Sequence, residues 1–286
     1  MSATSAAPGP FIELRGIEKS FGSNPVLRGV DLSVERGEIA TILGGSGTGK
    51  SVLLKHVVGL LHPDRGRVLI DGVDVTRLRE GAWVAVRRRV AYVFQGAALF
   101  DSLSVYENVA YALREHMHWR ETEIRARVAA CLEAVGMPGT EALMPAELSG
   151  GMRKRVGVAR SIALEPEAIL YNEPTTGLDP ANSRRIGQMI VDLRERLDMT
   201  SLVVTHELEL CFGISDRVVM LRRGQIVESG TPDEIRSSDH PFVRRFLAGE
   251  ADDEFPLAGD SRDDSGQEPH EDSRREERQQ GERNGK

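Results

Sequence analysis

A glycine-rich segment of eight residues directly follows a short apolar run and directly precedes a helix pattern. Residues 39–43 (IATIL) are continuously apolar, residues 44–51 read GGSGTGKS, and residues 51–61 (SVLLKHVVGLL) follow. The segment matches the pattern G-x-x-x-x-G-K-[ST], which forms a phosphate-binding loop when a strand precedes it and a helix follows it. The chain is therefore predicted to contain a buried strand, loop and helix of an α/β fold.

Each residue type in this loop suits a phosphate ligand. Glycines let the backbone turn its N–H groups inward, the helix start adds partial positive charge, Lys50 can reach the β- and γ-phosphates, and Ser51 can bind Mg²⁺. A dinucleotide-binding G-x-G-x-x-G pattern fails because Lys50 occupies the place of the third glycine. A glycine turn that binds nothing is the alternative. The candidate phosphate-binding residues are Gly44, Gly45, Ser46, Gly47, Thr48, Gly49, Lys50 and Ser51.

Two later segments repeat the strand and helix order. Residues 168–172 (AILYN) and 201–205 (SLVVT) are continuous apolar runs, and each precedes a helix pattern. Asp179 is placed to cap the first of these helices and Pro180 to begin it. Three such units predict a P-loop NTPase core, RecA-like, with a mostly parallel sheet.

The remaining patterns predict two additions to this core. Residues 11–14 and 26–34 alternate in hydrophobicity around an Asn24-Pro25 turn, which predicts an antiparallel β subdomain. Residues 104 to about 165 have helical spacing, which predicts a helical insertion spanning about 96–165. Residues 217–230 return to strand alternation.

Two helices are expected near the end of this body. Thr231 and Glu234 form the capping box of one helix, and residues 242–247 suit a packed terminal helix.

Charge is distributed unevenly along the chain. The segment 250–286 has 13 acidic and 6 basic residues, which accounts for the whole net charge of −7. It has too few apolar residues to offset the entropy of ordering it, so we predict a disordered tail, with an acidic recruitment segment as the alternative. Residues 1–10 are also predicted to be disordered, and 11–249 to form the body. A neutral body favours no nucleic-acid partner. No apolar run is long enough to cross a bilayer.

A second segment suited to phosphate lies about a hundred residues after the first. Ser149-Gly150-Gly151 opens a basic helix, whose first amides are free to bind an anion; a plain helix cap is the alternative. An apolar strand ending in Asn172-Glu173 follows, then residues 176–179, then His206.

This ordered series closely resembles the ATP-binding subunits of ABC transporters over residues 11 to 247. Met152 and the segment 94–109 resemble the Mla (Mkl) branch, the ATPases of bacterial MCE-type lipid transporters. The resemblance implies an ATP-hydrolysing subunit that binds ATP and Mg²⁺. It also implies a head-to-tail dimer with a second copy, an integral-membrane permease, an MCE-type substrate-binding protein, and a peripheral place on the cytoplasmic face of the inner membrane.

The resemblance also assigns roles to single residues. Phe21 would stack on adenine, Ser149, Gly150 and Gly151 would bind the γ-phosphate of the partner's ATP, and Asp179 would belong to the D-loop. Glu173 would polarise the attacking water. His206 would contact the γ-phosphate, with a capping role as its alternative. Gln95, with Ser51 and Asn172, would bind Mg²⁺, and it would link the site to the insertion unless it is merely structural. Residues 97–106 would dock the permease, unless they are buried packing.

Asn172 departs from the resemblance, because the family normally has an aspartate there. One negative charge is missing beside a hard dication that prefers carboxylates. We therefore expect weaker Mg²⁺ binding and slower turnover, with Glu173 still able to act as the base. Two alternatives remain open: a soluble ABC-type ATPase not linked to transport, and a regulatory subunit that binds nucleotide and hydrolyses it weakly.

Overall fold

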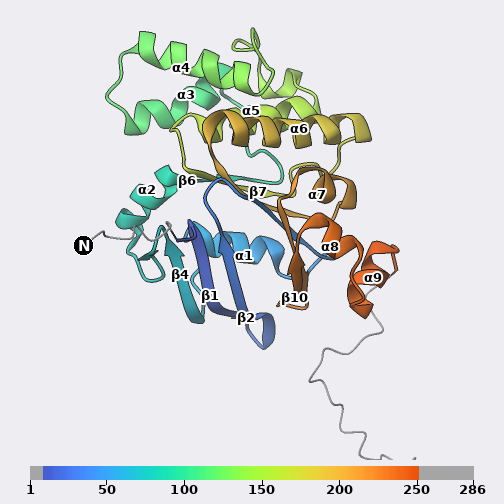
Figure 1. Ribbon diagram of the computed structural model, residues 1–286. Helices are drawn as coiled ribbons and strands as arrows, with labels where there is room; N and C mark the ends of the chain where they lie inside the picture. Colours follow the sequence, from blue (N-terminus) through green and yellow to red (C-terminus); the bar gives the residue numbers. More distant parts are fainter. Residues whose placement is uncertain (1–8, 251–286) are drawn as a thin grey trace, which may run out of the picture. The chain divides into compact units, whose positions relative to one another are not determined.

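The computed structural model describes residues 9–250, and all structural statements concern that range (Figure 1). The predicted disordered ends, 1–10 and 250–286, fall outside it except for residues 9, 10 and 250. The limits drawn for the domains stay predictions. The strands are β1 Ile12–Phe21, β2 Asn24–Val34, β3 Ile39–Leu43, β4 Arg65–Ile70, β5 Val73–Asp74, β6 Val90–Val93, β7 Ala168–Asn172, β8 Thr200–Thr205, β9 Arg217–Arg222 and β10 Gln225–Gly230. The helices are α1 Lys50–Val57, α2 Glu80–Arg89, α3 Val105–His116, α4 Glu121–Ala134, α5 Gly150–Ile162, α6 Pro180–Leu197, α7 Leu208–Ile214, α8 Pro232–Arg236 and α9 Pro241–Leu247, with a 3-10 turn at Pro145–Glu147.

The central sheet has the strand order β10-β9-β3-β8-β7-β6. Neighbours from β9 to β6 are parallel, and only β10 is antiparallel. The continuous apolar runs at 39–43, 168–172 and 201–205 are β3, β7 and β8, as predicted. Their register places Leu43 opposite Thr205 and Asn172 opposite Val204. The loop after β3 and the residues that follow β7 and β8 therefore emerge at the same edge of the sheet.

The three central strands β3, β7 and β8 are buried at every position, which explains why their sequences are mostly apolar. In β8, Leu202 and Val204 pack into one core with α1, α2 and the antiparallel strands, whereas Val203 packs into a second core with α3 to α6. Figure 1 shows α3, α4 and α5 together on the far side of the sheet from β1, β2 and β4. These are the helices predicted for residues 104 to about 165.

The second sheet is antiparallel, in the order β2-β1-β4-β5. The antiparallel pair β1 and β2 was predicted, but the turn at Asn24-Pro25 is wrong. The turn lies at residues 22 and 23, where Gly22 has a φ of 61°, a value that glycine adopts readily. Pro25 instead lies within β2 and pairs with Ser20 of β1. Because β2 is at the edge of the sheet, the missing N–H of Pro25 is tolerated.

The helix after the glycine loop is shorter than the predicted 51–61. α1 ends at Val57 because Gly59 turns left-handed with a φ of 65°, and Leu60 N donates to Lys55 O at 2.9 Å. The capping box of Thr231 and Glu234 is present at α8, as predicted. The terminal helix predicted at 242–247 is α9.

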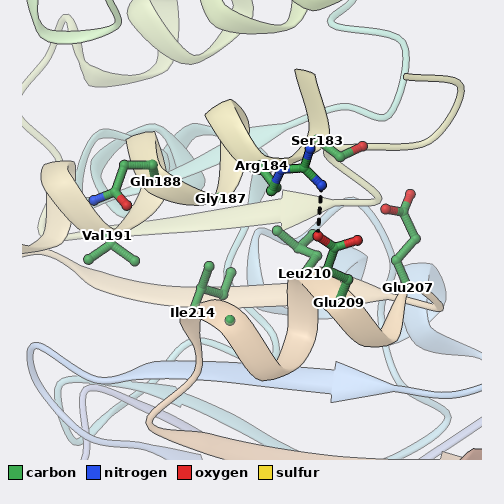
Figure 2. Close-up of a pocket in the computed structure, with 10 residues that line it drawn as sticks. Ser183, Arg184, Gly187, Gln188, Val191, Glu207, Glu209, Leu210 and Ile214 are labelled. Atoms are coloured by element: carbon green, nitrogen blue, oxygen red, sulfur yellow. Dashed lines mark hydrogen bonds and ion pairs between the residues drawn. The ribbon is translucent and has the colours of Figure 1, made fainter. Parts of the chain in front are cut away.

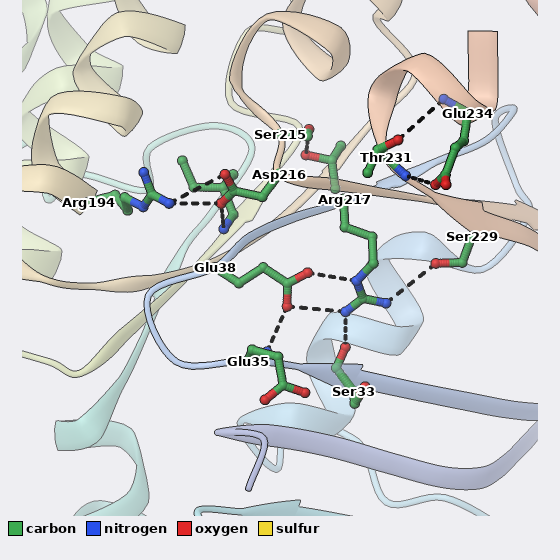
Figure 3. A network of polar contacts seen from close by, with 12 residues as sticks. Ser33, Glu35, Glu38, Arg194, Ser215, Asp216, Arg217, Ser229, Thr231 and Glu234 are labelled. Atoms are coloured by element: carbon green, nitrogen blue, oxygen red, sulfur yellow. Dashed lines mark hydrogen bonds and ion pairs between the residues drawn. The ribbon is translucent and has the colours of Figure 1, made fainter. Parts of the chain in front are cut away.

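One arginine ties the two sheets together (Figure 3). Arg217 at the start of β9 lies 2.6 Å from the carboxylate of Glu38, and it also donates to the carbonyl oxygen of Ser33 in β2 and to Ser229 in β10. The bond to Ser33 joins β9 of the central sheet to β2 of the antiparallel sheet, and the mostly buried Glu38 holds the guanidinium in place.

Candidate functional site

The glycine loop closely approaches its neighbours on both sides. A Cβ on Gly44 would lie 2.3 Å from the carbonyl oxygen of Leu221, and one on Gly49 would lie 2.9 Å from Leu27 Cδ2. Gly49 also has a φ of 103°, so only glycine fits there without strain. The loop therefore keeps its path because of packing, and it leads directly into the amino end of α1.

Lys50, the first residue of α1, is buried with 4% of its surface exposed. Its Nζ donates to the carbonyl oxygens of Gly44 and Gly45, both at 2.8 Å, and lies 3.5 Å from Glu173 Oε1. Burial lowers the pKa of Lys50, and the charge of Glu173 opposes that shift. The ammonium is thus held at the mouth of the loop, beside the only carboxylate with which it forms an ion pair in the described chain.

Ser51, in α1, contacts Asn172 at the end of β7, the residue that replaces the usual aspartate. Its Oγ donates to Asn172 Oδ1 at 2.7 Å. A hydroxyl and an amide oxygen are hard donors of the kind that Mg²⁺ accepts when phosphates and water complete its shell, so the pair fits this ion. No cluster of three or more His, Cys, Asp or Glu side chains within residues 9–250 could hold a metal alone.

Glu173 is the residue on which the site converges. Its Oε2 lies 2.6 Å from His206 Nδ1 and accepts a bond of 2.9 Å from Thr176 Oγ1, while Oε1 faces Lys50. The residue is 9% exposed and has a φ of 51°, which is uncommon for a side chain of this size. Strained backbone of this kind is concentrated at functional sites.

Two of the candidate residues stand apart from this cluster. Phe21 ends β1 with 48% of its surface exposed, and Lys19 Nζ lies 5.7 Å from the centre of its ring. Gln95 follows β6 by two residues and is exposed; its side chain forms no hydrogen bond with any residue between 9 and 250. An exposed aromatic ring can stack on a base, but within residues 9–250 no hydrogen bond joins Gln95 to Ser51 or Asn172.

The segment around Ser149 lies on a different element. Ser149 caps α5, its Oγ accepting from Met152 N at 3.3 Å, and its side chain is exposed. In the described range, no hydrogen bond or ion pair joins residues 149–151 to the loop 44–51. Asp179 caps α6 by accepting from Asn182 N at 2.9 Å. The capping prediction for Asp179 is therefore confirmed.

A cavity of about 280 Å³ lies beside this cluster but outside it, between α6 and α7 (Figure 2). Its wall joins apolar Leu210 and Ile214 to the ion pair of Arg184 and Glu209, which is 3.1 Å long. A second cavity, of about 300 Å³, lies near Arg217. Neither of these two cavities is lined by a residue of the glycine loop.

Comparison with known proteins agrees with this geometry. The family model described as ABC transporter matches residues 27–176. "Probable ribonucleotide transport ATP-binding protein mkl" of Mycobacterium leprae is 43% identical over 84% of this chain and 70% of that protein. "Intermembrane phospholipid transport system ATP-binding protein MlaF" of Haemophilus influenzae is 41% identical over 85% and 92%, and its namesake in Escherichia coli K12 is 37% identical over 87% and 94%.

Solved structures show the same relationship. A dimeric ATP-binding cassette, MJ0796, in a post-hydrolysis state bound to ADP and Pi has a TM-score of 0.72 and 30% identity, covering 77% of this chain and 98% of that one. The cbiO1 subunit of Clostridium perfringens, part of the transporter complex cbiONQ, has a TM-score of 0.75 and 28% identity, covering 84% and 95%. The chain therefore belongs to the ABC transporter family, as an ATP-binding cassette.

Two contacts of the site were not predicted from the sequence. Thr176 donates to the carboxylate of Glu173, and Lys154 donates to backbone oxygens of the same turn. Thr176 lies only three residues after Glu173, so a turn there could have been anticipated. Nothing in the sequence pattern marks Lys154 among the basic residues of α5.

Proposed function

We propose that this chain hydrolyses ATP to drive a bacterial transporter that moves phospholipids or related hydrophobic substrates. The observation that carries the proposal is the placement of Glu173 at the mouth of the glycine loop, between Lys50 and His206. A buried carboxylate held there has the position of a general base for a water that attacks a bound γ-phosphate.

The loop and α1 would bind the phosphates through backbone N–H groups and the partial positive charge of the helix start. Lys50 now donates to carbonyl oxygens of its own loop, and β- and γ-phosphate oxygens would replace them as its acceptors. Ser51 and Asn172 would hold Mg²⁺, which neutralises charge on the phosphates when bound. Phe21 would stack on the adenine.

Hydrolysis needs a positioned water and a proton acceptor. Thr176 and His206 fix Oε2 of Glu173, and Oε1 becomes available once Lys50 turns to the phosphates. The water oxygen bonds to the γ-phosphorus as the bond to the β–γ bridging oxygen breaks, and Glu173 accepts the water's proton. ADP and phosphate are the products.

The Ser149–Gly151 segment would complete the site from a second copy. Ser149 is exposed, and within residues 9–250 this helix start makes no hydrogen bond or ion pair with its own glycine loop, although free amides of this kind bind anions. A head-to-tail dimer would place it on the partner's γ-phosphate. The dimeric state of the MJ0796 cassette supports this arrangement.

A membrane partner would supply the transport path. No helix within residues 9–250 is long and apolar enough to span a bilayer. Residues 97–106 are our candidate docking surface for a permease, since Phe100 is 45% exposed, although Val105 in the same segment is buried. Gln95 lies beside this surface and would link it to the site. An MCE-type substrate-binding protein would complete the assembly, at the cytoplasmic face of the inner membrane.

The names of the relatives differ in the cargo, ribonucleotides for mkl and phospholipids for MlaF. We favour phospholipids because Met152 and the segment 94–109 resemble the ATPases of MCE-type lipid transporters, and MlaF is matched over 92% of its length. A weakly hydrolysing regulatory subunit is the second candidate, and Asn172 favours it, since the Ser51 partner lacks a negative charge.

Phosphate release by the purified full chain tests the ATPase. We expect the wild type to release phosphate from Mg·ATP. Glu173→Gln should release it at least about 100-fold more slowly, because a general base contributes roughly 10²–10⁴ in rate. Equal rates would overturn the assignment of the base. Copurification with a multispan membrane protein, followed by ATP-driven transfer of a labelled phospholipid or a labelled ribonucleotide, tests the cargo.

A further inference from the structure

The turn that follows β7 holds Glu173 in a strained conformation. Its backbone N–H donates to Val204 O in β8 at 2.9 Å, and its φ of 51° reverses the chain toward Thr176. Such a conformation is sparsely populated and persists only where the surroundings impose it. Contacts to the backbone carbonyl oxygens of this turn therefore help to set the direction of the Glu173 carboxylate.

Those contacts come from Lys154, on the second turn of α5. Its Nζ donates to Thr176 O at 2.7 Å and, over a longer distance of 3.4 Å, to Glu173 O. Burial lowers the pKa of Lys154, and the nearby carboxylates of Glu207 and Glu173 oppose that shift. The Lys154 side chain thus connects α5 to the turn, and its ammonium donates to the carbonyl oxygens of the first and last residues of that turn, Glu173 and Thr176.

The start of α5 packs against residues that follow the Glu173 turn in the sequence. A Cβ on Gly150 would lie 3.5 Å from Leu178 Cδ2, and one on Gly151 would lie 3.3 Å from the Asn182 side chain. Residues 149–151 and Lys154 are separated by a single helical turn. A displacement of the start of α5 would therefore also move Lys154 and the turn of residues 173–176.

We propose that Lys154 is a positioning residue for hydrolysis. It holds the turn of residues 173–176 so that the Glu173 carboxylate faces Lys50 and His206, and it connects the phosphate-binding start of α5 to that carboxylate. Within residues 9–250, no hydrogen bond or ion pair joins Lys154 to the glycine loop 44–51, so we expect it to act through the turn that carries Glu173. The inference rests on the proposed role of Glu173 as the base.

The test compares Lys154→Met and Lys154→Arg in the full chain, with Arg155→Met as the matched control. Arg155 is the next cation of α5, and it donates to Gly136 O at 2.9 Å on another side of the helix. We expect Lys154→Met to lower kcat roughly 10- to 100-fold with KM for ATP changed less than about twofold, because small misplacements of a reacting group have effects of this size. Lys154→Arg should recover most of kcat, and Arg155→Met should retain it.

Hydrogen exchange separates positioning from general loss of structure. The amides of residues 174–178 should exchange faster in Lys154→Met than in the wild type, whereas those of β7 and β8 should be unchanged. In a Glu173→Gln background, Lys154→Met should lower the residual rate no further. An unchanged kcat for Lys154→Met, or an equal loss for Arg155→Met, would overturn the inference. Equal rates for the wild type and Glu173→Gln would instead overturn the proposed function.

Discussion

The glycine loop at 44–51 and the start of α5 at 149–151 have the same chemical feature, a helix start that follows glycine or serine and offers free amides. Their surroundings differ. The first is enclosed by residues of its own chain, since Lys50 pairs with Glu173 and Ser51 with Asn172. The second leaves Ser149 exposed, with no polar contact to that loop within residues 9–250. We propose that the first region binds nucleotide by itself and that the second binds the nucleotide of a second copy.

Replacing Lys50 should have the largest effect, because it damages the region that is complete in one chain. Lys50→Ala removes a charged donor from the loop, and bonds to charged groups contribute about 1.5–3 kcal/mol each. We expect ATP affinity, measured by calorimetry, to fall about 100-fold or more. Lys55→Ala, on the same helix, is the control and should bind ATP as the wild type does. Wild-type affinity for Lys50→Ala would contradict the comparison.

Replacing Ser149 should separate the two regions. Ser149→Asp retains a good helix cap but places a negative charge where a partner's phosphate would lie. We expect the hydrolysis rate to fall roughly 10- to 100-fold, while ATP affinity at the chain's own glycine loop changes less than about twofold. Thr231→Asp, a matched substitution at the cap of α8, should leave both unchanged. Full hydrolysis by Ser149→Asp would show that the start of α5 is not part of the site.

Replacing Asn172 should have the smallest effect, and it refines the description of the enclosed region. Asn172→Asp adds a carboxylate beside Ser51, which suits Mg²⁺ better than an amide. We expect half-maximal ATPase activity at a severalfold lower Mg²⁺ concentration, with turnover faster by a few fold. Asn24→Asp, at the exposed start of β2, controls for the added charge. Identical Mg²⁺ curves for Asn172→Asp and the wild type would show that the departure is silent.

The sequence predicted those strands that are buried on both faces of the sheet. β3, β7 and β8 are covered on both faces, so their apolar runs are continuous and could be predicted. The strands and the helix between α1 and Gln95 could not be predicted from the sequence. The first half of β4 (Arg65–Ile70) is exposed, α2 contains a glycine and three arginines, and β6 (Val90–Val93) has four residues, too few for a clear period.

The site divides in the same way. A local pattern marks residues 44–51, and order along the chain marks Glu173 and His206. The contacts among Lys50, Glu173 and His206 could not be derived from that order, because they depend on the parallel register that brings the ends of β3, β7 and β8 to one edge. Lys154 was missed for the same reason, since its acceptors are backbone oxygens of a distant turn.

A mixing experiment tests most directly whether one ATP is held by two copies. Lys50→Ala and Ser149→Asp chains, both also carrying Glu173→Gln to slow hydrolysis, are mixed with labelled Mg·ATP and passed through gel filtration. Each variant alone should retain no nucleotide in a dimer. The mixed dimer should retain one ATP, because one of its two sites joins an intact glycine loop to an intact start of α5. A mixture that retains no more ATP than the separate variants would contradict the account.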